Sequence, residues 1–166
     1  MPSHTPGDDD GSGSGDSEAA GPRIRRVLEY WKGLKGDLAL PAWASVNLMD
    51  IYDVAPHVAV LDVEGTGDAH RYRYRFVGTM LVEWRGRLRP ADPTGRLLDE
   101  IEWPFDPVPL FAAIETVATT ARPLILGADD MVDDGFHRFS RGLFPLGDPA
   151  GRVDQVLVCV EQDIPD

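Results

Sequence analysis

The stretch RYRYRFV, residues 71–77, decides the fold class of this chain. Aromatic and basic residues alternate along it, and successive side chains of a β-strand point to opposite faces of a sheet. The alternation therefore predicts a strand with Tyr72, Tyr74 and Phe76 on one face. Its arginines share the other face, either as a solvated row or as a docking row for an acidic partner or for the chain's own acidic tail.

A second strand is predicted just before it, in HVAVLDV at 57–63. This stretch is rich in valine and apolar on both faces, which is typical of a strand that lies centrally in a sheet. The GTGD sequence at 65–68 between the two strands has the composition of a turn. The two strands are therefore expected to pair as an antiparallel hairpin.

The middle of the chain predicts helices. A short helical turn is expected at 80–84 and, after a polar loop with prolines at 85–93, a short helix that Thr94 caps. A longer helix is predicted at 108–120, because apolar residues repeat there at helical spacing after an Asp-Pro start.

The last part of the chain predicts strands at 123–127, 135–146 and 153–161. An acidic stretch at 129–134 and the sequence GDPAG at 147–151 supply the turns between them. Turns of this length join antiparallel neighbours. The whole order predicts an α+β fold, a five-stranded antiparallel sheet with helices on one face.

The N-terminal part divides into a tail and an amphipathic helix. Residues 1–22 are acidic and rich in Gly and Ser, a composition typical of a disordered tail. Residues 23–166 are expected to form a single domain with its core in 56–162. A leading helix is predicted at 23–35. Its apolar stripe packs on its own domain or pairs with the same helix of a second chain, through Ile24, Val27, Leu28 and Trp31.

Composition narrows the function classes. The chain has 166 residues and a formal net charge of −12, which disfavours nucleic-acid binding because an acidic body repels phosphate. No apolar run has the length of about 20 residues that membrane insertion needs. Cys159 is the only cysteine, so an internal disulfide is excluded and the cytoplasm is the expected location.

Several short motifs occur in an order that resembles one family. They are YW at 30–31, LP at 40–41, Pro56 before LDV at 61–63, YRFVGT at 74–79, TGRLLDE at 94–100, RP at 122–123 and FPL at 144–146. Together with the order of elements, they resemble the short, stand-alone PAS-type proteins common in alphaproteobacteria. The resemblance covers 23–166, and the irregular segment 85–93 departs from it.

The resemblance implies a PAS-like domain with a regulatory role, either sensing a small molecule or docking to another signalling protein. The cavity of such a fold lies between the inner sheet face and the helices. The residues expected to line it, or else to form an ordinary core, are Tyr72, Tyr74, Phe76, Trp84, Leu98, Ile114 and Val117.

The sequence disfavours a haem, a covalently bound flavin and a calcium ion. A haem would need an axial histidine on the long helix, and 106–121 contain none. A covalently bound flavin would need a reactive cysteine in the middle region, whereas Cys159 lies among valines in the last strand and is expected to be a buried, inert thiol. The aspartates of 129–134 lack the spacing of a calcium loop, so a solvated turn is the favoured interpretation. The identity of any ligand stays open.

Three functions therefore remain. The first is a ligand sensor, the second a ligand-free interaction module that forms homodimers or binds another signalling protein, and the third a small cavity enzyme. The third would need a titratable pair such as His57 and Asp62 in one pocket, and no nucleophile-elbow, phosphate-loop or zinc-protease motif supports it. We therefore expect no enzyme, and an output through non-covalent association.

Overall fold

The computed structural model describes the backbone of residues 20–65, 70–132 and 135–163, and the side chains of 20–65, 70–127 and 139–162. Almost all of the predicted tail at 1–22 lies outside these ranges, as do the side chains of the acidic stretch 129–134. In the part of the chain that is described, no helix has the length and apolar character needed to cross a membrane.

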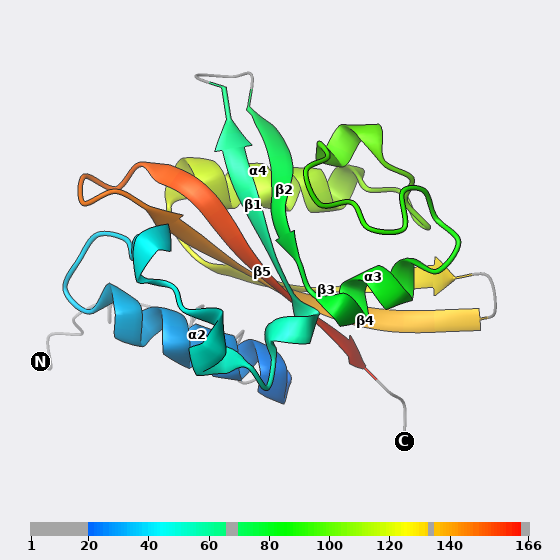
Figure 1. Cartoon of the computed structure of the whole chain (residues 1–166), viewed down its shortest axis with the longest axis horizontal. Helices are drawn as coiled ribbons and strands as arrows, with labels where there is room; N and C mark the ends of the chain where they lie inside the picture. Colours follow the sequence, from blue (N-terminus) through cyan, green and yellow to red (C-terminus); the bar gives the residue numbers. More distant parts are fainter. Residues whose placement is uncertain (1–19, 66–69, 133–134, 164–166) are drawn as a thin grey trace, which may run out of the picture.

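Five strands form one antiparallel sheet in the order β2-β1-β5-β4-β3 (Figure 1). The last strand therefore lies at the centre, between β1 and β4, and the prediction of a five-stranded antiparallel sheet is confirmed. The strands are β1 (Val58–Glu64), β2 (Arg71–Val77), β3 (Leu124–Val132), β4 (Gly135–Gly147) and β5 (Val153–Asp163).

The helices also fall close to the predicted ranges. Within the described residues the α-helices are α2 (Pro22–Lys35), α3 (Thr79–Arg85) and α4 (Val108–Thr120). Short 3-10 helices occupy the connections, as η1 (Trp43–Ser45), η2 (Leu48–Ile51), η3 (Ala55–His57) and η4 (Leu98–Glu100).

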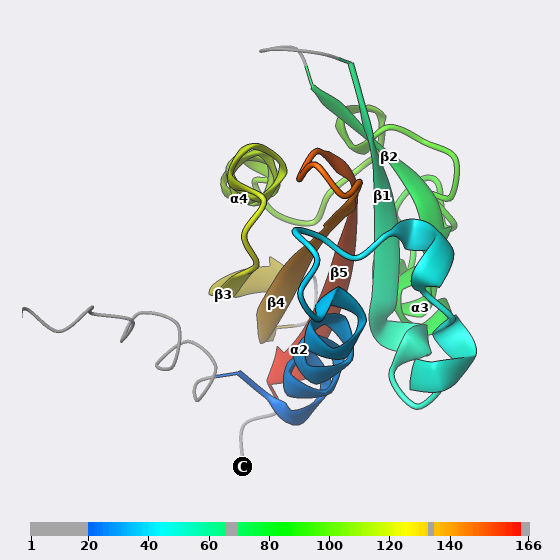
Figure 2. The ribbon, with the colours of Figure 1, turned by 90° about the vertical axis from the view of Figure 1, so that its left-hand side faces the viewer.

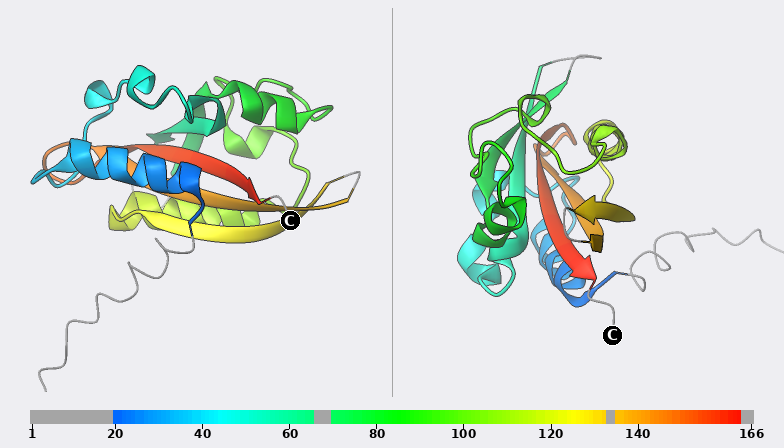
Figure 3. Two further views of the ribbon diagram at one scale, coloured as in Figure 1. Left: turned by 90° about the horizontal axis from the view of Figure 1, so that it is seen from below. Right: turned by 90° about the vertical axis from the view of Figure 1, so that its right-hand side faces the viewer.

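The helices α2 and α4 lie on opposite faces of the sheet (Figure 2). Alternation along β5 explains how both faces become apolar, because Leu157 and Cys159 point to one face and Val158 and Val160 to the other. The α2 helix runs along β5 (Figure 3). The helices α3 and α4 of the middle region contribute to one face of the sheet, and the N-terminal amphipathic helix α2 covers the other.

The apolar stripe of α2 is buried on its own sheet. Trp31 is 5% exposed, and its Nε1 donates a hydrogen bond to the Pro145 carbonyl at 2.8 Å. A Cβ atom at Gly142 would lie 2.9 Å from Ile24, so the helix approaches β4 where only glycine leaves room. The stripe therefore packs on its own domain, and the alternative that it forms a partner or dimer surface needs a correction. The side chains that such a surface would use are only 0–6% exposed, namely Ile24, Val27, Leu28 and Trp31.

A β-bulge in β2 changes which aromatic residues share a face. Val60 pairs with Phe76 and the next residue, Leu61, pairs with Tyr74, which leaves Arg75 as an extra residue. An extra residue reverses the alternation, because paired residues point to the same face and neighbours to opposite faces. Phe76 therefore lies on the α2 face, opposite to Tyr74, and the prediction that the two share a face is wrong.

The outer arginines of β2 are paired with carboxylates of the same chain. Arg71 contacts Asp99 at 2.9 Å, Arg73 contacts Glu64 at 2.6 Å and Arg75 contacts Asp62 at 2.7 Å. These pairs explain an arginine row in an acidic protein and favour the interpretation of a solvated outer face.

The acidic stretch after α4 is mostly strand. β3 continues through Val132 and pairs with β4 as far as Gly135, so the turn predicted at 129–134 is shorter than expected. Acidic residues are poor strand formers, and here pairing with the long β4 overrides that preference.

Candidate functional site

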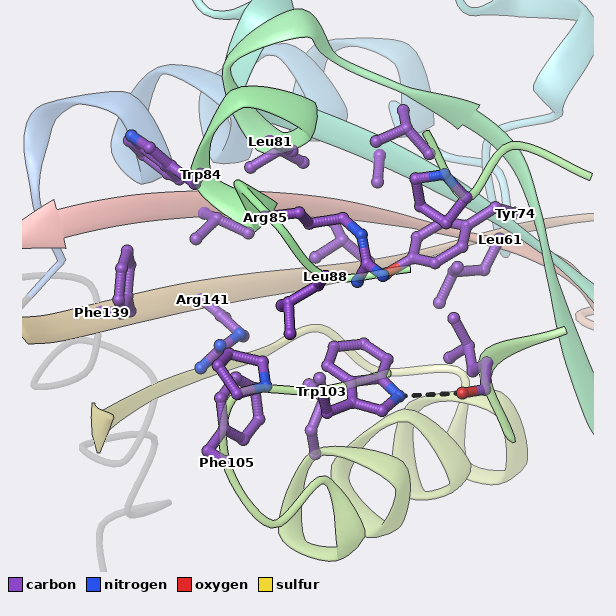
Figure 4. Close-up of a pocket in the computed structure, with 18 of the residues that line it drawn as sticks. Leu61, Tyr74, Leu81, Trp84, Arg85, Leu88, Trp103, Phe105, Phe139 and Arg141 are labelled. Atoms are coloured by element: carbon purple, nitrogen blue, oxygen red, sulfur yellow. Dashed lines mark hydrogen bonds between the residues drawn. The ribbon is translucent and has the colours of Figure 1, made fainter. Parts of the chain in front are cut away.

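A cavity of about 130 Å³ lies between the α4 face of the sheet and the chain segment from α3 to α4 (Figure 4). Its wall is mostly aromatic and aliphatic. The lining residues are Ala59, Leu61, Tyr74, Val77, Leu81, Trp84, Arg85, Leu88, Pro93, Leu98, Trp103, Pro104, Phe105, Leu110, Ile114, Phe139, Arg141, Val158 and Val160.

Four of the residues predicted to line a cavity do so, namely Tyr74, Trp84, Leu98 and Ile114. They come from β2, α3, η4 and α4, so the structure brings together four separate parts of the chain. Their role in binding a ligand stays a prediction.

The other three predicted residues do not line the cavity. Phe76 is turned to the opposite face by the bulge. Val117 is fully buried in the core. The Tyr72 hydroxyl donates a hydrogen bond to the Glu115 carboxylate on α4. Burial raises the pKa of Tyr72, and the hydrogen bond to Glu115 raises it further. Tyr72 thus joins β2 to α4.

Aromatic rings form much of the wall. The ring centroids of Trp103 and Phe105 are 5.6 Å apart. The Trp103 Nε1 donates a hydrogen bond to the Leu98 carbonyl at 2.9 Å, drawn as the dashed line in Figure 4. Trp84 lies between His57 and Phe139, with ring centroids 5.4 Å and 5.6 Å away. These contacts fix the ring planes, so the wall has a defined shape.

Two arginines line this otherwise apolar cavity. Arg85, at the end of α3, donates from Nε to the Pro90 carbonyl at 3.0 Å, while its Nη2 is buried and has no hydrogen-bond partner among the described residues. Burial lowers the pKa of Arg85. Arg141 is 7% exposed, and its guanidinium carbon lies 5.1 Å from the centre of the Phe105 ring.

The Tyr74 hydroxyl lies close to both positive charges. Figure 4 shows the Arg85 guanidinium reaching toward it. Burial raises the pKa of Tyr74 to about 12, and the charges of Arg85 and Arg141 oppose that rise. The hydroxyl is therefore neutral at ordinary pH, a polar group next to two guanidinium groups.

Sequence reasoning missed Arg85, Leu88, Trp103, Phe105, Phe139 and Arg141. Alternation could have found Arg141, because it shares a face of β4 with Phe139 and Leu143. For Arg85 no comparable signal exists, since Arg87 and Arg89 follow at once in the sequence. Which arginine turns inward depends on where α3 ends, at Gly86 with a φ of +59°.

The pair that the enzyme hypothesis needed does not share the cavity. The His57 ring packs against Trp84 at an interplanar angle of 55°. Burial lowers the pKa of His57, and the charge of Arg23 adds to this effect. Asp62 is paired with Arg75 on the outside of β1. Cys159 is buried as predicted, and burial raises the pKa of its thiol to about 12.

No protein-family model and no curated protein matches this chain. Solved structures similar to it include the light-state structure of the blue-light photoreceptor Aureochrome1 LOV, with 12% identity, a TM-score of 0.48, and coverage of 72% of this chain and 90% of that chain. A structure of an RsLOV variant has 12% identity, a TM-score of 0.44, and coverage of 70% and 69%. The structure of an RNA-binding light-oxygen-voltage receptor has 19% identity and a TM-score of 0.44, with coverage of 73% of this chain and 35% of that chain. This chain therefore spans about a third of that receptor. The likeness concerns the fold alone.

Proposed function

We propose that this chain is a sensory, regulatory PAS-like domain that binds a small-molecule ligand in the cavity between its sheet and helices. We further propose that it acts in the cytoplasm and signals by non-covalent association, with a second copy or with another signalling protein. The observation that carries the proposal is the cavity itself, an apolar hollow with a few polar groups. Ligand sites in proteins have this composition.

The cost of an empty cavity supports the same proposal. The apolar wall of an unfilled hollow lacks packing partners on one side, and this loss of contacts costs free energy. A ligand that fills the space restores these contacts. A functional pocket is therefore a better account of the hollow than an inefficiently packed core.

Native mass spectrometry of the purified chain, compared with its denatured mass, tests ligand binding. We expect an excess mass in the native spectrum that is lost on denaturation. Leu88→Trp fills the cavity from its half-buried edge and should remove the excess. Leu38→Trp is the matched control, because Leu38 is 52% exposed and lies outside the cavity.

The proposal would be contradicted if both spectra showed the mass of the polypeptide alone and if no compound in a library of small aromatic compounds raised the melting temperature. An excess mass that persists in Leu88→Trp would place the ligand elsewhere. Sedimentation velocity with and without the co-purified compound then tests whether occupancy changes association.

The second candidate function is a ligand-free interaction module. The observation that favours it is a pair of exposed side chains, Met49 within η2 and Tyr52 directly after it, which are 74% and 73% exposed. Exposed apolar side chains that are neighbours can form a contiguous patch, and such patches mark interaction sites. If this candidate is right, Met49→Asp with Tyr52→Asp abolishes association in sedimentation velocity, while the cavity variant Leu88→Trp leaves it unchanged.

A further inference from the structure

The cavity is electrically unlike the protein around it. The chain as a whole carries a formal net charge of −12. The described residues that line the cavity include two arginines, Arg85 and Arg141, and neither Asp nor Glu. Arg85 thus places a guanidinium group in a wall whose described residues include no carboxylate, and a guanidinium group favours a negative ligand.

Arg85 is built into the wall with one donor unused. Its Nε is held by the Pro90 carbonyl at 3.0 Å, which fixes the plane of the guanidinium group. Its Nη2 is buried, and no described residue accepts a hydrogen bond from it or forms a salt bridge with Arg85. The charge of Glu102 acts against the effect of burial on the pKa of Arg85, but the Glu102 carboxylate accepts a hydrogen bond from the Arg89 amide at 2.8 Å.

An unused buried donor on a charged group is costly, because a buried polar group loses its hydration without compensation. Replacing Arg85 by an apolar residue would remove this cost, so the arginine is best explained by an acceptor that is supplied from outside the chain. Arginine presents a planar fork of donors that matches a carboxylate in geometry. The Tyr74 hydroxyl, next to the same guanidinium, can donate a further hydrogen bond.

The rest of the wall sets the remaining features of the ligand. Trp84, Trp103 and Phe105 present rings, and rings pack favourably on planar ligands. The volume of about 130 Å³ is close to that of an engineered cavity of about 150 Å³ that binds benzene. The space therefore suits a single ring with a small substituent.

From these observations we infer that the cavity binds a small aromatic carboxylate with one ring, and that Arg85 binds the carboxylate while the aromatic wall holds the ring. This inference rests on the proposed ligand-binding function and narrows it to one chemical class. The ring and the charge are separate requirements, so they can be tested separately.

The experiment is isothermal titration of the full chain with three probes at neutral pH. Benzoate carries both ring and charge, benzyl alcohol carries the ring alone, and acetate carries the charge alone. We expect benzoate to bind at least about tenfold more tightly than either of the others, because a charge-assisted hydrogen bond contributes about that much. The two-ring probe 2-naphthoate should bind more weakly than benzoate, because the cavity holds a single ring.

Variants identify the anchoring residue. Arg85→Met keeps most of the side-chain volume and should weaken benzoate binding by about 10- to 100-fold, with little change for benzyl alcohol. Arg85→Lys keeps the charge without the planar fork and should restore part of the affinity. Arg87→Met is the matched control, because Arg87 is exposed and lies outside the cavity. Circular dichroism of each variant verifies that the fold is retained.

The outcomes separate this inference from the function on which it rests. Equal affinity for benzoate and benzyl alcohol, or unchanged benzoate binding in folded Arg85→Met, overturns the carboxylate inference while the cavity remains a ligand site. Tight binding of 2-naphthoate overturns the single-ring limit. Failure of every probe to bind, combined with a bare native mass, overturns the ligand-binding function as well.

Discussion

Glu161 of β5 reaches the first turn of α2, where its Oε1 accepts a hydrogen bond from the Arg23 amide at 3.2 Å. Its Oε2 accepts from the Ile24 amide at 3.5 Å. The first amides of a helix have no partner within the helix, and a carboxylate there also interacts favourably with the helix dipole. Gly21 precedes the helix without a side chain that could cap it, so a distant strand supplies the cap.

Removing this cap should destabilise the protein. Glu161→Gln keeps the size of the side chain but loses its charge, and we expect it to lower the free energy of unfolding by about 1–2 kcal/mol. Urea denaturation followed by tryptophan fluorescence measures the change. The control is Glu29→Gln on the exposed side of α2, where the loss of a 3.8 Å pair with Lys32 should cost less than about 0.5 kcal/mol. Equal effects of the two variants would show that the cap is unimportant.

Two glycines of the same region should respond in opposite ways to alanine. A Cβ atom at Gly21 would overlap the Glu161 carboxylate, so Gly21→Ala should displace the cap and lower stability by about 1–3 kcal/mol. Gly33 lies inside α2 with open space around it, so Gly33→Ala should raise stability by about 0.5–1 kcal/mol. Thermal unfolding of both variants checks the difference in sign, and a Gly21→Ala protein as stable as the parent would refute the steric argument.

Removal of a single hydroxyl group breaks the hydrogen bond that joins β2 to α4. Tyr72→Phe removes the hydroxyl that donates to Glu115, and we expect a loss of about 1–2 kcal/mol in the free energy of unfolding. Tyr52→Phe serves as control, because Tyr52 is 73% exposed and its change should stay within about 0.5 kcal/mol. Alkaline absorbance titration supplies a second readout: the variant should lose a phenol that ionises late, since the pKa of Tyr72 is raised in the folded protein.

Buried Cys159 should make the protein sensitive to alkali. Burial raises the pKa of its thiol from 9.0 to about 12, so above pH 9 the unfolded chain loses a proton that the folded chain keeps. Stability is therefore fully present below pH 9 and falls as the pH rises toward 12. Urea denaturation at a series of pH values should show a shallower alkaline decline in Cys159→Ala. At pH 8 the folded thiol should react with a disulfide reagent only as fast as the protein unfolds; rapid reaction of the native protein would contradict its burial.

The sheet could be predicted because its signals are local. Alternation in 71–77, the valine-rich stretch before it and the turn residues between them are visible within a few positions. The bulge at Arg75 could not be predicted in this way, because it depends on how β1 and β2 pair along their whole length. This one extra residue places Phe76 on the face opposite to the one that simple alternation predicts.

The cavity could be predicted only in part, for a similar reason. Tyr74, Trp84, Leu98 and Ile114 are apolar or aromatic residues that any core-facing pattern selects. Arg85 and Arg141 break that pattern, and reasoning from hydrophobicity places arginines in solvent. The residues that distinguish the cavity from a core are thus those that a search for core residues leaves out.

Val160 and Glu161 are neighbours on β5, yet one lines the cavity and the other holds the start of α2 on the far side of the sheet. Consecutive α-carbons are only about 3.8 Å apart, so a wall residue of the cavity and the cap of α2 are attached to adjacent points of one backbone. The cavity and the first turn of α2 are therefore joined through a single strand, with no other element of the core between the two residues.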